Sequence, residues 1–178
     1  RAIEAKVIAN PLGFFRIGTM GDPCHDWEAT VETIEWLSPL AVPVVITKHW
    51  MKASDEQVAR MIAAGTVLNT SISALDTDAE RKHRVGQFWR YRLAGGRSVA
   101  RIVSAKFNRL TPEGARMGAI QDELWNLPTT LDNPLRISAR HQLVTDGVVE
   151  ISPLHDLGDE PVPISLERPD TYLGHCSA

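Results

Sequence analysis

Strand-like and helix-like segments alternate along most of this chain, and this alternation restricts the possible folds more than any other feature. Short apolar runs such as residues 42–47 suit strands that are covered on both faces. Between them lie amphipathic segments such as residues 27–37, which carry apolar residues on one face and glutamates on another. Such alternation specifies a parallel sheet with right-handed crossovers, either an open doubly wound sheet or a (β/α) barrel.

Capping and breaking residues set the expected limits of the elements. Ser54 to Gln57 and Thr77 to Glu80 form capping-box patterns, and Pro112 stands at a first helical position. One later strand is expected either at 135–137 or at 142–144, with a hairpin-like turn leading to 148–151. We expect the earlier strands at residues 14–18, 42–47, 66–73 and 99–107. The helix that starts at 78 should direct Val85, Phe88, Trp89 and Leu93 inward.

Polar residues follow several successive strands, and this favours the barrel over the doubly wound sheet. A barrel assembles its site from the carboxyl ends of many strands, whereas a doubly wound sheet concentrates it at one switch point. We therefore predict an α/β fold, a (β/α) barrel, over residues 1–152. Prolines and acidic residues accumulate afterwards, so residues 153–178 are predicted to form an extended tail.

Composition excludes several classes of function. A formal net charge of -3 without a Lys/Arg run gives no support for nucleic-acid binding. No apolar run approaches the roughly 20 residues that cross a bilayer. The two cysteines, Cys24 and Cys176, are too few for a disulfide scaffold and fit a reducing, cytoplasmic compartment. Because the chain starts at Arg1, we expect it to be part of a longer protein.

The segment from Gly18 to Pro23 is a glycine-rich turn directly after a predicted strand, where backbone can approach a ligand closely. Its spacing matches neither the dinucleotide-binding nor the P-loop pattern, so those ligands are not supported. Cys24, His25 and Asp26 could offer metal ligands, but adjacent residues do not all face one ion. We expect Asp26 to cap the following helix.

Two later strand ends carry further candidates. Lys48 follows an apolar run, so its ammonium could hold a carboxylate or a phosphate at the mouth of a site, or could be a solvated loop lysine. Asn69, Ser71 and Ser73 share one strand face by the period of two. Such a polar row either binds a hydrogen-bonding ligand, such as a sugar, or forms a satisfied polar layer.

These segments, 16–23, 44–49 and 69–73, resemble successive strands of the radical S-adenosylmethionine superfamily, and most of all its spore photoproduct lyase-like branch. The resemblance covers residues 14 to about 108. It implies a partial barrel that holds S-adenosylmethionine and a four-iron, four-sulfur cluster at the strand ends. The glycine-rich turn would meet the methionine amino group, Lys48 and Ser71 would contact the cofactor, and the end of the next strand would contact adenosine. The resulting cofactor-binding candidates are Gly18, Thr19, Gly21, Asp22, Lys48, Asn69, Ser71, Ser73, Ser104, Lys106 and Asn108.

The function implied by the resemblance is reductive cleavage of S-adenosylmethionine to a 5′-deoxyadenosyl radical, which abstracts hydrogen from an unknown substrate. A nucleic-acid substrate is possible by family resemblance alone. The family's C-x-x-x-C-x-x-C loop is absent, so we expect the cluster ligands in a missing N-terminal part. The chain alone should then bind no cluster and be inactive.

Three interpretations remain open beside this one. The chain could be an ordinary (β/α)-barrel hydrolase or aldolase that uses Lys48, His49 and Asp22, a barrel fragment that does not catalyse a reaction, or a degenerate barrel that binds without iron. Cys176 could be a surface thiol, or it could ligate a cluster or zinc if further cysteines follow it.

Overall fold

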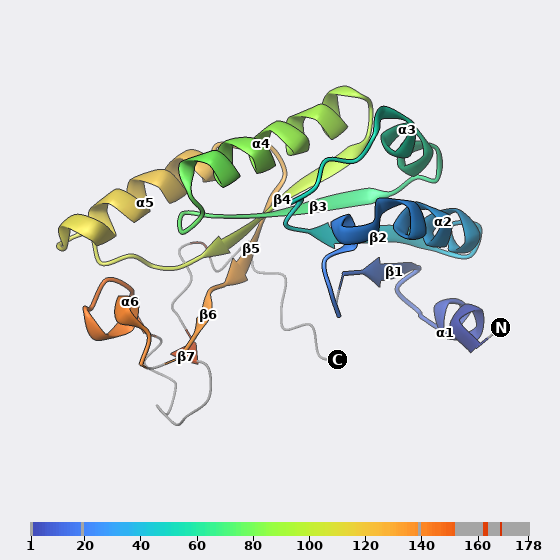
Figure 1. The fold of residues 1–178 in the computed structure, drawn as a ribbon. Helices are drawn as coiled ribbons and strands as arrows, with labels where there is room; N and C mark the ends of the chain where they lie inside the picture. Colours follow the sequence, from blue (N-terminus) through green and yellow to red (C-terminus); the bar gives the residue numbers. More distant parts are fainter. Residues whose placement is uncertain (1, 19, 139, 152–161, 164–167, 169–178) are drawn as a thin grey trace. The chain divides into compact units, whose positions relative to one another are not determined.

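The computed structural model describes residues 2–18, 20–138, 140–151, 162–163 and 168 (Figure 1). The chain divides into two compact units, the first made of residues 1–71 and 78–100 and the second of residues 72–77 and 101–178. The strands are β1 (Phe14–Ile17), β2 (Val42–Thr47), β3 (Val67–Ser73), β4 (Arg97–Ser104), β5 (Thr130–Pro134), β6 (Arg136–Ile137) and β7 (Val162–Pro163). The helices are α1 (Ala2–Ile8), α2 (Trp27–Leu37), α3 (Asp55–Ala63), α4 (Asp78–Leu93), α5 (Pro112–Trp125) and α6 (Gln142–Thr145), with a 3-10 turn, η1, at Pro23–Asp26.

Among the described residues, the main sheet contains five strands in the order β1-β2-β3-β4-β5. Each strand therefore lies beside the one that precedes it along the chain. The sheet is parallel, as the β1–β2 and β2–β3 registers illustrate. A helix joins each neighbouring pair, as in parallel sheets with right-handed crossovers. The predicted α/β class is confirmed, and the strand order is compatible with a partial (β/α) barrel.

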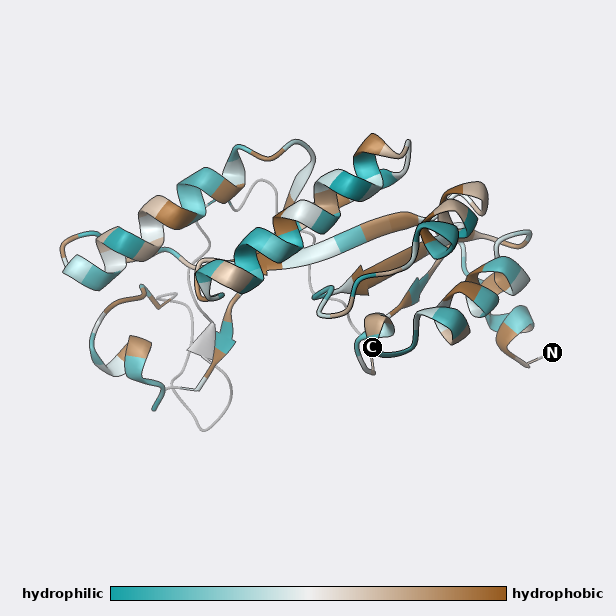
Figure 2. Cartoon of the chain, turned by 45° about the horizontal axis from the view of Figure 1, so that its top comes forward, coloured by the Kyte–Doolittle hydropathy of each residue, from teal (hydrophilic) through white to brown (hydrophobic). Residues whose placement is uncertain are grey.

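The core of the first unit lies between its strands and its helices. Val45 of β2 and Leu68 of β3 are fully buried, and they belong to one cluster with residues of α2 and α3. Figure 2 shows brown hydrophobic stretches in the strands of this unit, and helices in which brown and teal segments alternate. The helix residues of this cluster include Trp27, Val31, Ile34, Val58, Met61 and Tyr91.

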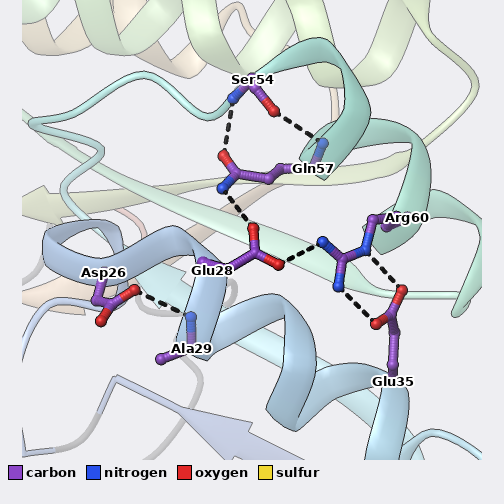
Figure 3. Close-up of polar contacts among 7 residues, drawn as sticks. All are labelled: Asp26, Glu28, Ala29, Glu35, Ser54, Gln57 and Arg60. Atoms are coloured by element: carbon purple, nitrogen blue, oxygen red, sulfur yellow. Dashed lines mark hydrogen bonds and ion pairs between the residues drawn. The ribbon is translucent and has the colours of Figure 1, made fainter.

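Helices α2 and α3 are also joined by polar contacts on the surface (Figure 3). The Arg60 guanidinium donates to Glu35 through two nitrogens and to Glu28 through a third hydrogen bond of 2.6 Å. Hydrogen bonds from Arg60 lower the pKa of both glutamates. The predicted capping box of Ser54 and Gln57 is confirmed, and the Gln57 amide extends the network to Glu28.

The second unit has its own hydrophobic cluster and a buried polar layer. Ser104, at the end of β4, donates to the buried carboxylate of Asp132 on β5. The Gln121 side chain of α5 satisfies both backbone groups of Ala105. The cluster consists of Ala74, Ala105, Phe107, Met117, Leu135, Val148 and Val149.

The second unit contains one of the two alternatives expected for the later strand, because β6 (Arg136–Ile137) lies within residues 135–137, and it differs from the sequence analysis in two other respects. Residues 142–144 lie in helix α6 rather than a strand, because the His141 ring accepts the Leu143 backbone N–H and caps a helical turn. Strand β5 was not expected, because Asp132 and Asn133 read as turn residues. Both side chains are paired across the unit, Asp132 with Ser104 and Asn133 with Arg101.

The expected inward face of α4 is also partly wrong. Phe88 is fully buried as expected, but Leu93 is 80% exposed and Trp89 is also exposed. The buried positions are Arg84, Phe88 and Tyr91, which lie on one face of the helix because they are four and three residues apart. The first of them is a charged residue. Burial of the Arg84 guanidinium is compatible with its position over the Trp50 ring.

Candidate functional site

A pocket of about 410 Å³ lies at the ends of β1, β2 and β3, within the first unit. Five of the sequence-derived candidates line it, and they come from all three strand ends. Ile46 of β2 pairs in register with Asn69 of β3, so the following residues of both strands reach the same edge. The lining residues are Gly18, Gly21, Asp22, His25, Ile46, Thr47, Lys48, Trp50 and Ser71.

The two glycines of the turn after β1 have different surroundings. Gly18 has a φ of +109°, and a Cβ atom there would overlap the Ile46 carbonyl oxygen and crowd the Pro23 ring. The β1–β2 packing therefore requires glycine at position 18. Gly21 has no heavy atom within 4 Å of a built Cβ, and its φ is outside the left-handed region. Packing does not require glycine there, and a side chain at position 21 would take up open space beside the pocket.

Asp22 joins the ends of β1 and β2. Its carboxylate accepts hydrogen bonds from the Thr47 hydroxyl (2.5 Å), the Lys48 backbone N–H (2.6 Å) and the Cys24 backbone N–H (3.1 Å). Burial alone raises the pKa of Asp22, but these hydrogen bonds outweigh burial and hold the pKa below its ordinary value of 3.8. Asp22 is therefore a fixed negative charge at the pocket wall.

Lys48 contributes the positive charge. Its Nζ lies 5.4 Å from the centroid of the Trp50 ring, and no carboxylate pairs with it in the part of the chain that the structure describes. His25 meets the same indole edge-on, with ring centroids 6.5 Å apart. The lining of the pocket thus includes an anion, a cation and an aromatic ring.

The polar face of β3 divides into residues with and without internal partners. Ser71 lines the pocket, and Asn69 is 7% exposed, with its side-chain oxygen lacking a hydrogen-bond partner among the described residues. Ser73 is engaged, because its hydroxyl donates to the Val103 carbonyl and accepts the Leu75 N–H. A buried amide oxygen without a partner is costly, and a ligand hydroxyl could satisfy it.

The remaining candidates belong to the second unit and have internal partners there. Ser104 donates to Asp132, and Lys106 forms an ion pair of 2.7 Å with Glu150. The Asn108 side chain donates to the Gly147 carbonyl at 3.0 Å and accepts the Leu110 N–H. The resemblance assigns Lys106 to the same cofactor as Gly21, Lys48 and Ser71, and this assignment stays a prediction.

His49 is not among the residues that line the pocket. Its side chain is 2% exposed, packs against the Trp27 ring, and has no hydrogen-bond partner at either ring nitrogen among the described residues. Its backbone has a φ of 55°, in the left-handed region. Burial, and next the charge of His83, lower the pKa of His49 to about 4. His49 therefore does not share the lining of this pocket with Lys48 and Asp22.

No metal site is formed by Cys24, His25 and Asp26, because no group of three or more potential metal ligands is gathered in the described part of the chain. Cys24 is buried, and burial raises the pKa of its thiol. The expected capping role of Asp26 is confirmed, because its carboxylate accepts the Ala29 N–H of α2 at 3.0 Å. Thr19, Cys176 and most of the predicted tail lie outside the described residues.

Sequence reasoning did not select Trp50 and Thr47 for this site, and it considered His25 only as a metal ligand. Period-two alternation could have found Trp50, because it continues the face of Ile46 and Lys48 beyond the end of β2. Thr47 lies on the opposite face, and only the position of Asp22 shows that its hydroxyl binds a pocket residue.

No protein-family model matches the chain, and neither does any curated protein or solved structure. Among the described helices, none is long and apolar enough to cross a membrane.

Proposed function

We propose that this pocket binds S-adenosylmethionine and that the chain is part of a radical S-adenosylmethionine enzyme of the spore photoproduct lyase-like type. One observation carries the proposal. Gly21, Lys48 and Ser71 come from three different strand ends, the resemblance assigns all three to the same cofactor, and they line one pocket. The pocket volume of about 410 Å³ lies within the range of roughly 300–1,000 Å³ for small-molecule sites.

The charges of the pocket match the amino-acid end of S-adenosylmethionine. Lys48 would pair with the ligand carboxylate, and the ionised Asp22 would pair with the ligand ammonium. The Ser71 hydroxyl in the pocket lining is suited to hydroxyl groups, such as those of a ribose. The Asn69 amide oxygen, on the same face of β3, has no hydrogen-bond partner among the described residues. Bound S-adenosylmethionine would supply the 5′-deoxyadenosyl group that abstracts hydrogen from the substrate.

The iron–sulfur cluster of the family does not fit residues 1–178. Such a cluster takes thiolates gathered at one place, and this sequence contains only Cys24 and Cys176. The proposal for this chain is therefore restricted to holding and orienting S-adenosylmethionine. An enzyme of this type would need cluster ligands from outside the sequence, and the substrate is not identified by the pocket.

Replacement of Lys48 tests whether this residue binds the carboxylate of S-adenosylmethionine. We expect Lys48→Ala to weaken S-adenosylmethionine binding by about 10-fold, because a charge-assisted pair in a partly exposed site is lost. Decarboxylated S-adenosylmethionine should bind Lys48→Ala and the wild type with similar affinity, because that ligand has no carboxylate to lose. Isothermal titration with both ligands measures the difference.

Lys6→Ala on α1 is the matched control, because it removes the same charge away from the pocket. It should bind both ligands like the wild type. An equal loss of affinity for both ligands in Lys48→Ala would contradict the assignment of Lys48 to the ligand carboxylate. Absence of S-adenosylmethionine binding by the wild-type chain would contradict the proposed function itself.

A further inference from the structure

Trp50 is a large aromatic residue that the structure leaves open beside the pocket. It is 55% exposed and lines the pocket together with Gly21 and Lys48. Tryptophan usually buries most of its surface, and concave ligand sites are often lined by aromatic rings. The exposed indole is therefore a candidate contact surface for a ligand of this pocket.

Neighbouring groups hold the indole in place. The buried Arg84 guanidinium lies over the ring at 5.8 Å from the centroid, and the exposed Lys48 ammonium lies at 5.4 Å. His25 meets the ring edge-on. Because Arg84 is only 6% exposed whereas Lys48 is exposed, Arg84 is the fixed neighbour and Lys48 the one that can move.

A stacked base competes well against the Lys48 contact. An exposed cation–π contact is worth roughly 2- to 5-fold in an equilibrium constant, whereas a base stacked on an aromatic side chain is worth roughly 5- to 150-fold. A ligand with a planar base and an anionic group would make two favourable contacts when it displaces Lys48 from the indole. Its base would cover the indole, and the displaced ammonium would meet the anion.

The residues that the resemblance assigns to adenosine do not offer such a surface. Ser104, Lys106 and Asn108 each have a partner in the second unit, namely Asp132, Glu150 and the Gly147 carbonyl. Among the residues that line the pocket, Trp50 is the aromatic residue whose ring is large enough to cover a purine.

We propose that Trp50 stacks the nucleobase of the ligand, so that the pocket selects nucleosides that carry an anionic group. The identification of the ligand as S-adenosylmethionine rests on the proposed function, whereas stacking on Trp50 applies to any nucleoside of this class. Trp50 is then the residue that determines base recognition, and Lys48 determines recognition of the anion.

The test titrates the chain with S-adenosylmethionine and with adenosine monophosphate. Trp50→Ala should weaken S-adenosylmethionine binding roughly 5- to 150-fold, and Trp50→Phe should restore most of the affinity, because phenylalanine keeps a stacking face. The matched control is Trp36→Ala on α2, which removes an indole that is 48% exposed and bonded to Glu4. This control should bind like the wild type. Indole fluorescence should be quenched by the ligand in the wild type and less so in Trp50→Phe.

The outcomes separate the two proposals. Unchanged S-adenosylmethionine binding in Trp50→Ala, or a Trp50→Phe variant as weak as Trp50→Ala, overturns stacking and leaves the proposed function in place. A wild type that binds adenosine monophosphate through Trp50 but does not bind S-adenosylmethionine supports stacking and overturns the proposed function. Binding of neither nucleoside overturns both.

Discussion

Acidification from about pH 7 to about pH 4 is expected to cost the folded chain about 3 kcal/mol through His49 alone. The imidazole is buried against Trp27, has no hydrogen-bond partner among the described residues, and has a pKa of about 4. In the unfolded chain its pKa returns to about 6.5. Between these values the unfolded state binds more protons than the folded state, so the free energy of unfolding falls as the pH falls.

The charged groups around His49 determine the pH interval in which its effect on stability can be measured separately. The charge of His83 and, more weakly, that of Arg90 oppose protonation of His49, and Asp22 favours it. Asp22 itself has a lowered pKa, so its stabilising contribution is lost only below its ordinary value of 3.8. The interval from about pH 6.5 to about pH 5 therefore isolates His49 from this carboxylate.

Urea unfolding at several pH values measures this dependence. His49→Asn removes the titrating ring and keeps a residue that tolerates left-handed backbone, so the slope in that interval should become nearly flat. Loss of packing against Trp27 lowers the stability of this variant at every pH without changing the slope. His25→Asn, at an exposed histidine, is the control and should keep the wild-type slope. An unchanged slope in His49→Asn would show that other groups cause the loss.

Gly18→Ala is expected to destabilise the chain by on the order of 3 kcal/mol or more. Its Cβ would overlap the carbonyl oxygen of Ile46 on β2 and crowd the Pro23 ring of η1, which is buried. The φ of +109° at position 18 adds strain for any residue with a side chain. Thermal and urea unfolding of the variant measure the effect.

Gly21→Ala is the comparison for Gly18→Ala, because it makes the same chemical change three residues along the chain. A Cβ at position 21 meets no heavy atom within 4 Å, so stability should stay within about 0.5 kcal/mol of the wild type. Equal stabilities of the two variants would mean that Gly18 is not required by the packing of β1 against β2.

These two glycines illustrate what the sequence could predict about the site. A glycine-rich turn after a strand indicated close backbone approach, and this was sufficient to select the segment. The difference between Gly18 and Gly21 depends on the Ile46 carbonyl, which lies on another strand. A local pattern contains no information about that contact.

Prediction of the fold was limited in the same way, by contacts between residues that are far apart in the sequence. Helix α2 and strand β2 were predicted with their observed bounds, because hydrophobic periodicity and capping residues are local signals. Strand β5 was missed because the buried Asp132 is paired with Ser104, which lies 28 residues away in the sequence, so a local pattern does not reveal the pairing. The inward face of α4 was misjudged because arginine is normally exposed, whereas Arg84 lies against Trp50.

The most direct test of the central claim is isothermal titration of S-adenosylmethionine into the wild type, Gly21→Val and Gly86→Val. The valine at position 21 would enter open space beside the pocket, and the one at position 86 would enter open space on α4. We predict binding by the wild type and by Gly86→Val, with at least about a 10-fold loss in Gly21→Val at unchanged thermal stability. Wild-type affinity in Gly21→Val, or no binding by the wild type, would contradict a cofactor site at this pocket.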